Sequence, residues 1–220
     1  MKLSVLIPVY NEEDHIRELL ERVAAVPVEK ELVVVDDHTT DRTAEILRSV
    51  RLPNMQVIRH ERNLGKGSAV RTALAAATGE AVIIQDADLE YYPEDYPRLL
   101  EPMIKEGVRV VYGVRTLSNQ SLLRRLGNHF LTFVTNLLYG ARLKDMETCY
   151  KLVSRDLIQS FTIKSNRFDM EPEITAKLLK RGQRIRQVPI SYSPRVVRKL
   201  SPWRDGWPAL WALIKYRFVD

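Results

Sequence analysis

The 220-residue sequence contains one cysteine, no long apolar run and no internal repeat. The single cysteine, Cys149, excludes an internal disulfide bond, a Cys-rich zinc site and a disulfide-stabilised secreted scaffold. No stretch reaches the roughly 18 consecutive apolar residues of a membrane-spanning helix. The first apolar run, residues 2–9, has only the length of a strand, so we expect no signal peptide. These absences predict a cytoplasmic protein without a transmembrane helix.

The charge of the chain is unevenly distributed. Apolar residues make up 45% and charged residues 28%, as in ordinary globular proteins, and the formal net charge is +6. Residues 180–220 contain ten Lys and Arg against two Asp, which gives them a local charge of +8. All three tryptophans, Trp203, Trp207 and Trp211, lie in the same segment. This composition suits an anionic membrane surface or a nucleic acid, and a solvated basic tail packed by its tryptophans fits it equally well.

Short apolar runs rich in β-branched residues recur through the first half of the chain. Most are continuous rather than alternating, which is typical of strands buried on both faces of a parallel sheet. We expect strands at residues 5–7, 32–35, 57–58, 81–84 and 108–111. Helical patterns separate them, for example at residues 16–24 and 69–77. The alternation predicts an α/β fold with a mostly parallel central sheet flanked by helices.

The pattern changes after residue 115. A long helical stretch carries an apolar stripe on one side, formed by Leu123, Leu126, Phe130, Phe133, Val134 and Leu137. A further helix is expected from Glu171 to Gly182, and a last one from Pro208 to about Phe218. We therefore expect one domain at residues 1–192 and a short amphipathic extension at residues 193–220.

Polar residues follow consecutive strands of the expected sheet. Asn11 and Glu12 come after the first strand, Asp37 after the second, and Asp86 and Asp88 after the fourth. Ligands of open α/β sheets bind beyond the carboxyl ends of the strands. Two carboxylates spaced as Asp-X-Asp repel each other unless a cation such as Mg²⁺ or Mn²⁺ joins them. Such a metal usually shares its coordination sphere with the phosphates of a substrate.

The segment Gly65-Lys66-Gly67 precedes a helix after the third strand. Glycine permits close approach of a backbone, a helix N-terminus favours an anion, and lysine adds a positive charge. The spacing is not that of a Walker motif, so a nucleoside-triphosphatase loop is not expected. The segment instead predicts contact with a diphosphate.

Four segments in this order resemble one family. They are Val-Leu-Ile-Pro-Val-Tyr-Asn-Glu at 5–12, Val-Val-Val-Asp-Asp-His-Thr-Thr-Asp at 33–41, Asn-Leu-Gly-Lys-Gly at 63–67 and Gln-Asp-Ala-Asp-Leu at 85–89. The combination resembles the inverting GT-A glycosyltransferases, a family that includes dolichyl-phosphate mannose synthases and bacterial polyprenyl-phosphate glycosyltransferases. The resemblance covers roughly residues 3–192, with His38-Thr39 in place of the more usual Gly-Ser. It implies a Rossmann-like GT-A domain with a nucleotide-sugar half at residues 1–115 and an acceptor half at residues 116–192.

The resemblance also implies which residues bind the donor. The residues expected to contact the nucleotide sugar are Pro8, Tyr10, Glu12, Asp37, Lys66 and Asp86. The residues expected to hold Mg²⁺ or Mn²⁺ in the Asp-X-Asp (DXD) motif and after it are Asp86, Asp88 and Glu90. Tyr10 could also be a packed loop aromatic, and Glu12 a carboxylate that stabilises a helix N-terminus.

An acceptor site follows from the same resemblance. Arg115, Arg124 and Arg125 are the residues expected to bind the acceptor phosphate, since guanidinium groups suit that anion. Glu171 aligns with the catalytic base of processive relatives, and Asp145 is the second candidate. Arg115 could also simply cap a strand, and Arg124 and Arg125 could form a solvated helix face. Glu171, beside a proline at a helix start, could be a helix cap.

Together these residues predict a metal-dependent, inverting transfer of a sugar from a nucleoside diphosphate sugar to an acceptor, with polyprenyl phosphate as the expected acceptor. A phosphate needs no strong base near neutral pH, whereas a hydroxyl acceptor would require Glu171 to remove its proton. The alternatives are a transferase acting on a sugar or small hydroxyl acceptor, and a non-catalytic subunit that binds nucleotide sugars. No recognised nucleic-acid reader motif is present, so we expect no nucleic-acid partner.

The extension is expected to bring the enzyme to the inner face of a membrane without crossing it, with a membrane-embedded partner as another way to reach that surface. The side chains expected to insert are Trp203, Trp207, Leu210, Trp211, Leu213, Ile214 and Phe218. The alternative is that they fold back onto the protein and serve as packing.

Overall fold

A computed structural model describes residues 1–117, 120–194 and 202–219, with side chains from residue 206 onward in the last range. The strands are β1 (Leu3–Val9), β2 (Lys30–Asp36), β3 (Met55–Arg59), β4 (Ala81–Ile84), β5 (Val110–Arg115), β6 (Lys151–Ser154) and β7 (Arg186–Ile190). The helices are α1 (Ile16–Ala25), α2 (Thr43–Ser49), α3 (Lys66–Ala76), the 3₁₀ turn η1 (Pro93–Asp95), α4 (Tyr96–Glu106), α5 (Leu122–Tyr139), α6 (Arg155–Gln159), α7 (Met170–Lys180) and α8 (Pro202–Phe218).

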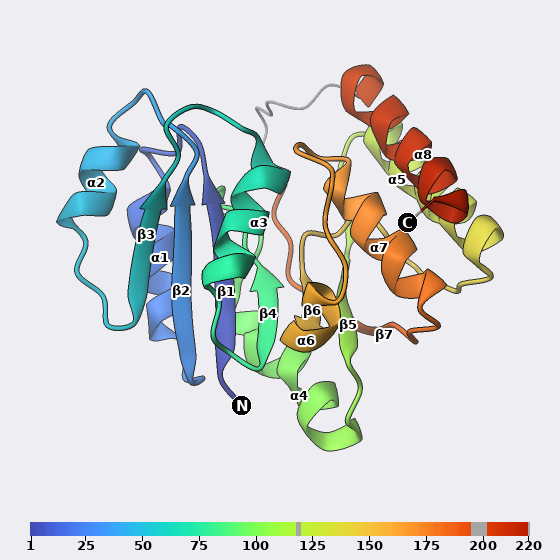
Figure 1. Ribbon diagram of the computed structural model, residues 1–220, viewed down its shortest axis with the longest axis horizontal. Helices are drawn as coiled ribbons and strands as arrows, with labels where there is room; N and C mark the ends of the chain where they lie inside the picture. Colours follow the sequence, from blue (N-terminus) through green and yellow to red (C-terminus); the bar gives the residue numbers. More distant parts are fainter. Residues whose placement is uncertain (118–119, 195–201, 220) are drawn as a thin grey trace.

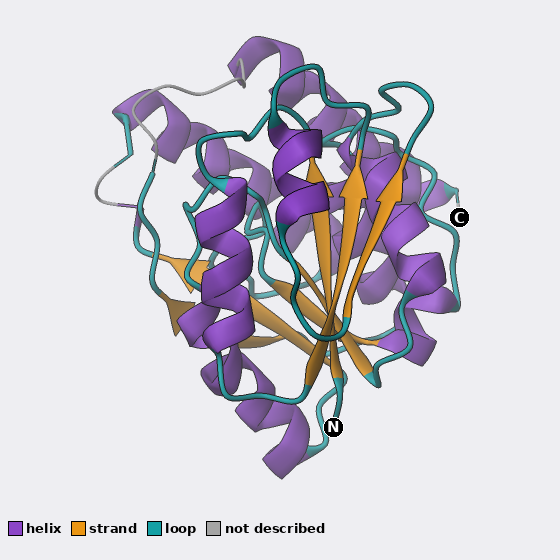
Figure 2. Ribbon diagram, turned by 90° about the vertical axis from the view of Figure 1, so that its left-hand side faces the viewer, coloured by secondary structure: helices purple, strands orange, loops and turns teal. Residues whose placement is uncertain are grey.

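The seven strands form one sheet in the order β3-β2-β1-β4-β6-β5-β7. Strand β6 runs antiparallel to both of its neighbours, and all other neighbouring strands are parallel. Helices cover both faces of the sheet (Figures 1 and 2). The predicted α/β fold with a mostly parallel sheet is confirmed. The sequence pattern did not predict β6 or β7. Strand β6 has only two consecutive apolar residues, Leu152 and Val153, and β7 begins with Arg186 and Gln187 and contains Pro189.

Strand direction explains why distant segments share one edge of the sheet. The carboxyl ends of β1 to β5 and of β7 all lie at that edge, because these strands run the same way. Since β6 runs the opposite way, its amino end and the residues before it lie at the same edge. Parts of both halves of the chain therefore converge where ligands of such sheets bind.

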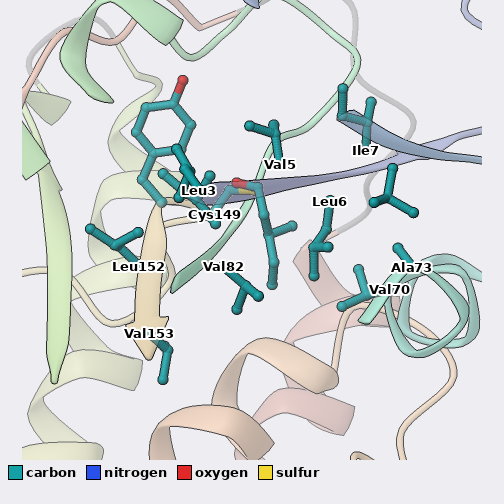
Figure 3. Close-up of a cluster of buried hydrophobic side chains, with 14 of the residues drawn as sticks. Leu3, Val5, Leu6, Ile7, Val70, Ala73, Val82, Cys149, Leu152 and Val153 are labelled. Carbon is teal, nitrogen blue, oxygen red and sulfur yellow. The ribbon is translucent and has the colours of Figure 1, made fainter. Parts of the chain in front are cut away.

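The main core lies between the sheet and its helices. Residues Leu3, Leu6 and Ile7 of β1 are fully buried, and the predicted stripe of α1 packs inward. Cys149 is 3% exposed and belongs to this cluster (Figure 3). It thus has the packing role expected of it, although its position also brings it to the edge of the candidate site.

Helix α8 packs beside α5 and α7 (Figure 1). It begins at Pro202, earlier than predicted, because a proline is tolerated at the start of a helix, and Pro208 lies inside it. Ala209, Leu213 and Tyr216 are buried, so the expectation that Leu213 inserts into a membrane is wrong: it packs onto the protein. Predictions for residues 195–201 and for the Trp203 side chain lie outside the described residues. No described helix has the length and apolar character needed to cross a membrane.

Candidate active site

Lys66 lies at the centre of the converging strand ends. Its Nζ is 2.6 Å from Oδ1 of Asp86 and 3.1 Å from Oε1 of Glu171. It also lies 3.9 Å from the Cys149 sulfur and above the ring of Phe168. Burial alone would lower the pKa of Lys66, but the neighbouring acidic groups outweigh it and raise this pKa well above its usual value. Lys66 is therefore a fixed positive charge shared between the two halves of the site.

Glu171 is held between two ammonium groups. Its other oxygen, Oε2, lies 2.9 Å from Nζ of Lys151, whose side chain is fully buried in β6. Glu171 itself is 5% exposed and lies in the first turn of α7. The two ammonium groups offset the charge of this carboxylate, although Oε2 accepts no hydrogen bond from a described residue. The geometry thus favours an orienting role for Glu171.

Asp86 and Asp88 follow β4 as predicted. The Asp88 carboxylate accepts a bond from the Glu90 amide at 3.2 Å, and Glu90 is 3% exposed with Oε2 accepting from the Tyr192 hydroxyl at 2.8 Å. Within the described residues, no three His, Cys, Asp or Glu side chains are arranged to hold a metal ion by themselves. The donor set still fits Mg²⁺ or Mn²⁺, because such ions are commonly held by one or two carboxylates and complete their sphere with substrate phosphates and water.

Asp37 organises the loop that precedes α3. Its two oxygens accept the amides of Leu64 and Gly65 at 2.8 and 2.7 Å, and its Oδ1 is 2.7 Å from Nδ1 of His60. A carboxylate offers about four lone-pair positions, so one further bond to a nucleotide base is chemically possible. His38, which follows, has φ +64°, a conformation in which glycine is less strained than other residues.

Two backbone amides at the start of α3 donate hydrogen bonds within the chain. Those of Gly67 and Ser68 donate to the Asn166 carbonyl, at 2.8 and 3.4 Å. A Cβ at Gly65 or Gly67 would collide with the backbone of residues 165–166. The close approach that these glycines permit is thus used by the loop before α7. Contact of Lys66 and this segment with a diphosphate stays a prediction.

The residues after β1 lie next to the Asp-X-Asp segment, since β1 pairs with β4 and the Gln85 amide donates to Leu6. Pro8 lies near the end of β1, and Tyr10 is 40% exposed. The Glu12 carboxylate lies 3.5 Å from Nδ1 of His15, just before α1. The roles of these residues in binding a base and ribose remain predictions.

Arg115 forms a buried two-contact ion pair with Asp145. Its Nε and Nη2 lie 2.7 and 2.8 Å from the two Asp145 oxygens, and its guanidinium lies 5.3 Å from the centre of the Tyr192 ring. Asp145 also accepts the Arg115 amide. Both oxygens of Asp145 are thus engaged, which leaves it a poor candidate for a base. Arg124 and Arg125 lie at the start of α5, where Arg125 is exposed, and their contact with an acceptor phosphate stays a prediction.

Sequence reasoning missed Lys151, Glu147 and Tyr192. Tyr192 links the two sides of the site, since its hydroxyl donates to Glu90 and its ring packs under Arg115. Lys151 carried a recognisable signal, because a lone lysine beside Leu152 and Val153 at the start of a short apolar run must find partners when it is buried. Glu147 carried no such signal, because its surroundings come from distant parts of the chain.

Residues 4–161 match the family described as "Glycosyl transferase family 2". An uncharacterized protein of Methanocaldococcus jannaschii is 30% identical over 86% of this chain and 80% of its own length.

Relatives with named activities are longer. An undecaprenyl-phosphate 4-deoxy-4-formamido-L-arabinose transferase of Edwardsiella ictaluri is 37% identical over 65% of this chain and 46% of its own length. A dolichol-phosphate mannosyltransferase of Pyrococcus furiosus is 40% identical over 52% of this chain and 33% of its own length. The low-salt glycan biosynthesis hexosyltransferase Agl6 of Haloferax volcanii is 29% identical over 93% of this chain and 51% of its own length. The chain thus spans about half or less of each of these three proteins.

Among solved structures, a glucosyl-3-phosphoglycerate synthase from Mycobacterium tuberculosis, in complex with Mn²⁺, UDP and phosphoglyceric acid, superposes with a TM-score of 0.81. The match covers all of this chain and 79% of that one, at 22% identity. A likeness at this level of identity establishes the shared fold.

Proposed function

The chain belongs to glycosyl transferase family 2, and we propose that it transfers a sugar from a nucleoside diphosphate sugar to a polyprenyl phosphate, with a divalent metal and with inversion at the anomeric carbon. The observation that carries the proposal is the Lys66 cluster. Lys66 and the Asp86–Asp88 carboxylates stand at the carboxyl ends of β1 to β4, and Arg115 stands at the same edge on the other side. This arrangement supports the proposal of one position for a diphosphate at Lys66 and a second position for the acceptor phosphate towards Arg115.

On the donor side, Lys66 would contact the departing diphosphate. Asp86 and Asp88 are the residues that would hold Mg²⁺ or Mn²⁺, with Glu90 as a third ligand. A bound divalent cation would offset the negative charge that develops on the leaving group. Asp37 and the Pro8–Glu12 segment would bind the base and ribose. Two relatives with named activities act on lipid-linked phosphates by name, which supports the polyprenyl phosphate acceptor.

On the acceptor side, the transfer would be a single in-line displacement. A phosphate oxygen of the acceptor attacks the anomeric carbon while the bond from that carbon to the diphosphate breaks. Because a phosphate dianion is already nucleophilic, the engaged state of Glu171 and Asp145 is compatible with this acceptor. A hydroxyl acceptor would need a free base, which neither residue offers in its present contacts.

We further propose that the protein meets its acceptor at the surface of an anionic bilayer. Helix α5 exposes a row of large apolar side chains, each at least 54% exposed: Leu122, Leu123, Leu126, Phe130, Phe133 and Leu137. Neighbouring α8 exposes Trp207, Trp211 and Phe218, with Lys215 and Arg217 among them. Exposed apolar side chains beside basic ones suit shallow insertion between acidic lipids. We propose residues 1–115, 116–192 and 193–220 as the donor half, acceptor half and membrane-contacting extension.

The test is an assay with a panel of nucleotide sugars, Mn²⁺ and a short polyprenyl phosphate in detergent micelles. We expect release of nucleoside diphosphate together with a glycosylated lipid phosphate of inverted anomeric configuration, detected by mass spectrometry and NMR. Equal transfer to the unphosphorylated polyprenol would contradict the proposed acceptor class. Absence of transfer with every donor, alongside normal nucleotide-sugar binding, would support the non-catalytic alternative.

Asp88→Asn tests the metal assignment within this assay. We expect transfer to fall by at least about 100-fold and metal-dependent donor binding to be lost, with an unchanged melting temperature, because the substitution weakens a cation site and leaves the core intact. Asp156→Asn, at an exposed carboxylate on the opposite edge of the sheet, is the matched control. Full activity of Asp88→Asn would remove Asp88 from the metal site.

A further inference from the structure

Glu147 is a carboxyl group at the site that the proposed reaction does not use. Its Oε1 is shielded from solvent and accepts no hydrogen bond from any residue that the structure describes. A buried polar oxygen without a partner is costly, and native proteins keep such atoms mostly where a ligand, an ion or water completes them. The side chain as a whole is partly buried, and the open position at Oε1 can be filled by a ligand or by water.

The backbone around Glu147 is fixed by its own contacts. The amides of Met146 and Cys149 donate to side-chain hydroxyl groups at 3.1 and 2.9 Å. Lys151, from β6, donates to the Met146 carbonyl at 2.8 Å, and Asp145 is held in its two-contact ion pair. The lack of a described hydrogen-bond partner at Oε1 therefore occurs in a segment whose backbone is held in place by several contacts.

The charges around Glu147 come from both sides of the site. Lys151 of β6 and Arg115 of β5 are positive, whereas Glu171 of α7 and Asp145 of its own segment are negative. Burial raises the pKa of Glu147 to about 7; Lys151 and Arg115 oppose this rise, and Glu171 and Asp145 add to it. Both the protonated and the ionised form are therefore populated near neutral pH.

We propose that the protonated carboxyl group of Glu147 donates a hydrogen bond to the phosphate monoester of the acceptor. This inference rests on the proposed function, because it takes the acceptor to be a phosphate. The carboxylates of Asp86, Glu171 and Asp145 are offset by Lys66, Lys151 and Arg115. An ionised Glu147 would add a negative charge without such a partner and would repel an incoming dianion. A neutral carboxyl group instead supplies a donor where a dianion must be bound.

The transfer step leaves this proton in place. The acceptor oxygen forms its bond to the anomeric carbon, the bond from that carbon to the diphosphate breaks, and Glu147 keeps its hydrogen. The product is a phosphodiester with a single negative charge. Since it accepts hydrogen bonds less strongly than the dianion, the same contact favours release of the product.

Glu147→Gln separates this role from a structural one, because glutamine keeps an uncharged donor at every pH. We measure the affinity for citronellyl phosphate, with nucleoside diphosphate and Mn²⁺ present, between about pH 6 and pH 9. The wild-type affinity is expected to fall above about pH 7 as Glu147 ionises. The variant should lack this fall and bind about tenfold more tightly than wild type near pH 8.5. Identical pH profiles for both proteins would overturn the proposal.

A measurement on the unaltered protein keeps the test independent of whether the variant folds. Binding of citronellyl phosphate near pH 8, followed by calorimetry in two buffers of different ionisation enthalpy, should be accompanied by uptake of about one proton. At this pH the free Glu147 is mostly ionised and must take up a proton to donate to the dianionic ligand. Binding without proton uptake would also overturn the proposal. A glutamine variant that binds with the same uptake as wild type would assign the proton to another group and reject Glu147.

Further arms separate the possible outcomes. Citronellol, which lacks the phosphate, should bind without proton uptake. Glycerol 3-phosphate tests a water-soluble monoester: proton uptake with it as well would show that the site reads the phosphate and does not need the lipid. If wild type transfers sugar to citronellyl phosphate but its binding is independent of pH, the inference on Glu147 fails and the proposed function stands. If no phosphate binds at any pH, the proposed function fails first.

Discussion

Helices α5 and α7 pack in the same half of the molecule with opposite relations between composition and burial. Helix α7 has the sequence MEPEITAKLLK, and three of its four charged residues, Glu171, Glu173 and Lys177, are at most 5% exposed, whereas Lys180 at its end is exposed. Helix α5 is rich in Leu and Phe, yet its described apolar stripe faces outward. Charge is thus buried where the site needs it, and apolar surface is exposed where a bilayer could cover it. Each helix departs from the usual pattern in a direction that suits function.

The buried charges of α7 are compensated by dense local bonding. Glu173 Oε1 lies 2.6 Å from Lys177 Nζ, and its two oxygens accept the amides of Lys164 and Ser165 at 2.8 and 2.7 Å. Lys177 also donates to the Thr162 carbonyl at 2.6 Å. These contacts hold the loop before α7, and the same loop closes against the start of α3. The pair therefore fixes the positions of Glu171 and Lys66 indirectly.

Breaking this pair should give the largest change in stability. Glu173→Ala leaves the Lys177 ammonium buried without its carboxylate, and losing one partner of a buried pair costs about 3–5 kcal/mol. Chemical denaturation with circular dichroism measures this loss. The double substitution Glu173→Leu with Lys177→Met removes both charges and should recover much of it. An equal loss in the single and double variants would show that the loop amides, and not the ion pair, dominate.

Acidification should affect the same pair next. Although burial raises it, the pKa of Glu173 is lowered overall by Lys177 and the amides of Lys164 and Ser165. A lowered folded-state pKa means that its contribution to stability is complete above the unfolded value, about 4.3, and is lost as the pH falls through the folded value. The difference in free energy of unfolding between wild type and Glu173→Gln should therefore shrink below about pH 4. A difference that stays constant down to pH 3 would contradict this.

The sequence predicted the sheet and the residues at the ends of its strands, but it did not predict several contacts between distant segments. The continuous apolar runs of β1, β2 and β4 predicted the sheet, and Asp86, Asp88 and Lys66 were placed correctly at its edge. The periodicity of α5 revealed a stripe but could not say what covers it. The sequence did not reveal that the Gly67 and Ser68 amides in the first turn of α3 donate to Asn166, because this partner lies about a hundred residues away along the chain.

The acceptor side was harder to predict because it depends on non-local neighbours. Arg115 and Asp145 looked like two independent ligands, and only the tertiary structure shows that each engages the other. Glu147 and Lys151 acquire their environments from three separate elements. A local pattern carries no information on such contacts, whereas strand ends are brought together by topology alone.

Replacing exposed aromatic residues of α5 should reduce membrane binding more than it affects the fold. Phe130→Ser combined with Phe133→Ser is expected to lower partitioning onto acidic vesicles by about tenfold, because a fully buried Phe contributes about 1.5–3 kcal/mol and shallow insertion recovers part of that. Sedimentation with acidic and neutral vesicles measures the change. Ile104→Ser, at a residue of α4 that is 64% exposed, is the matched control. Equal loss in both variants would indicate nonspecific adsorption.

The smallest expected effect is the one that separates the two helices most sharply. Leu126, on α5, is 56% exposed, so Leu126→Gln removes little buried apolar area and should change the free energy of unfolding by no more than about 0.5 kcal/mol. Leucine and glutamine also have similar helix propensities. The measurement is denaturant unfolding in the absence of lipid. A loss of about 2 kcal/mol or more would mean that another surface of this chain or of a second copy covers the stripe in solution, and would withdraw its support from bilayer contact. A negligible change would mean that this exposed apolar surface does not stabilise the fold of the protein alone. The charged residue Glu173 on α7, by contrast, would stabilise it.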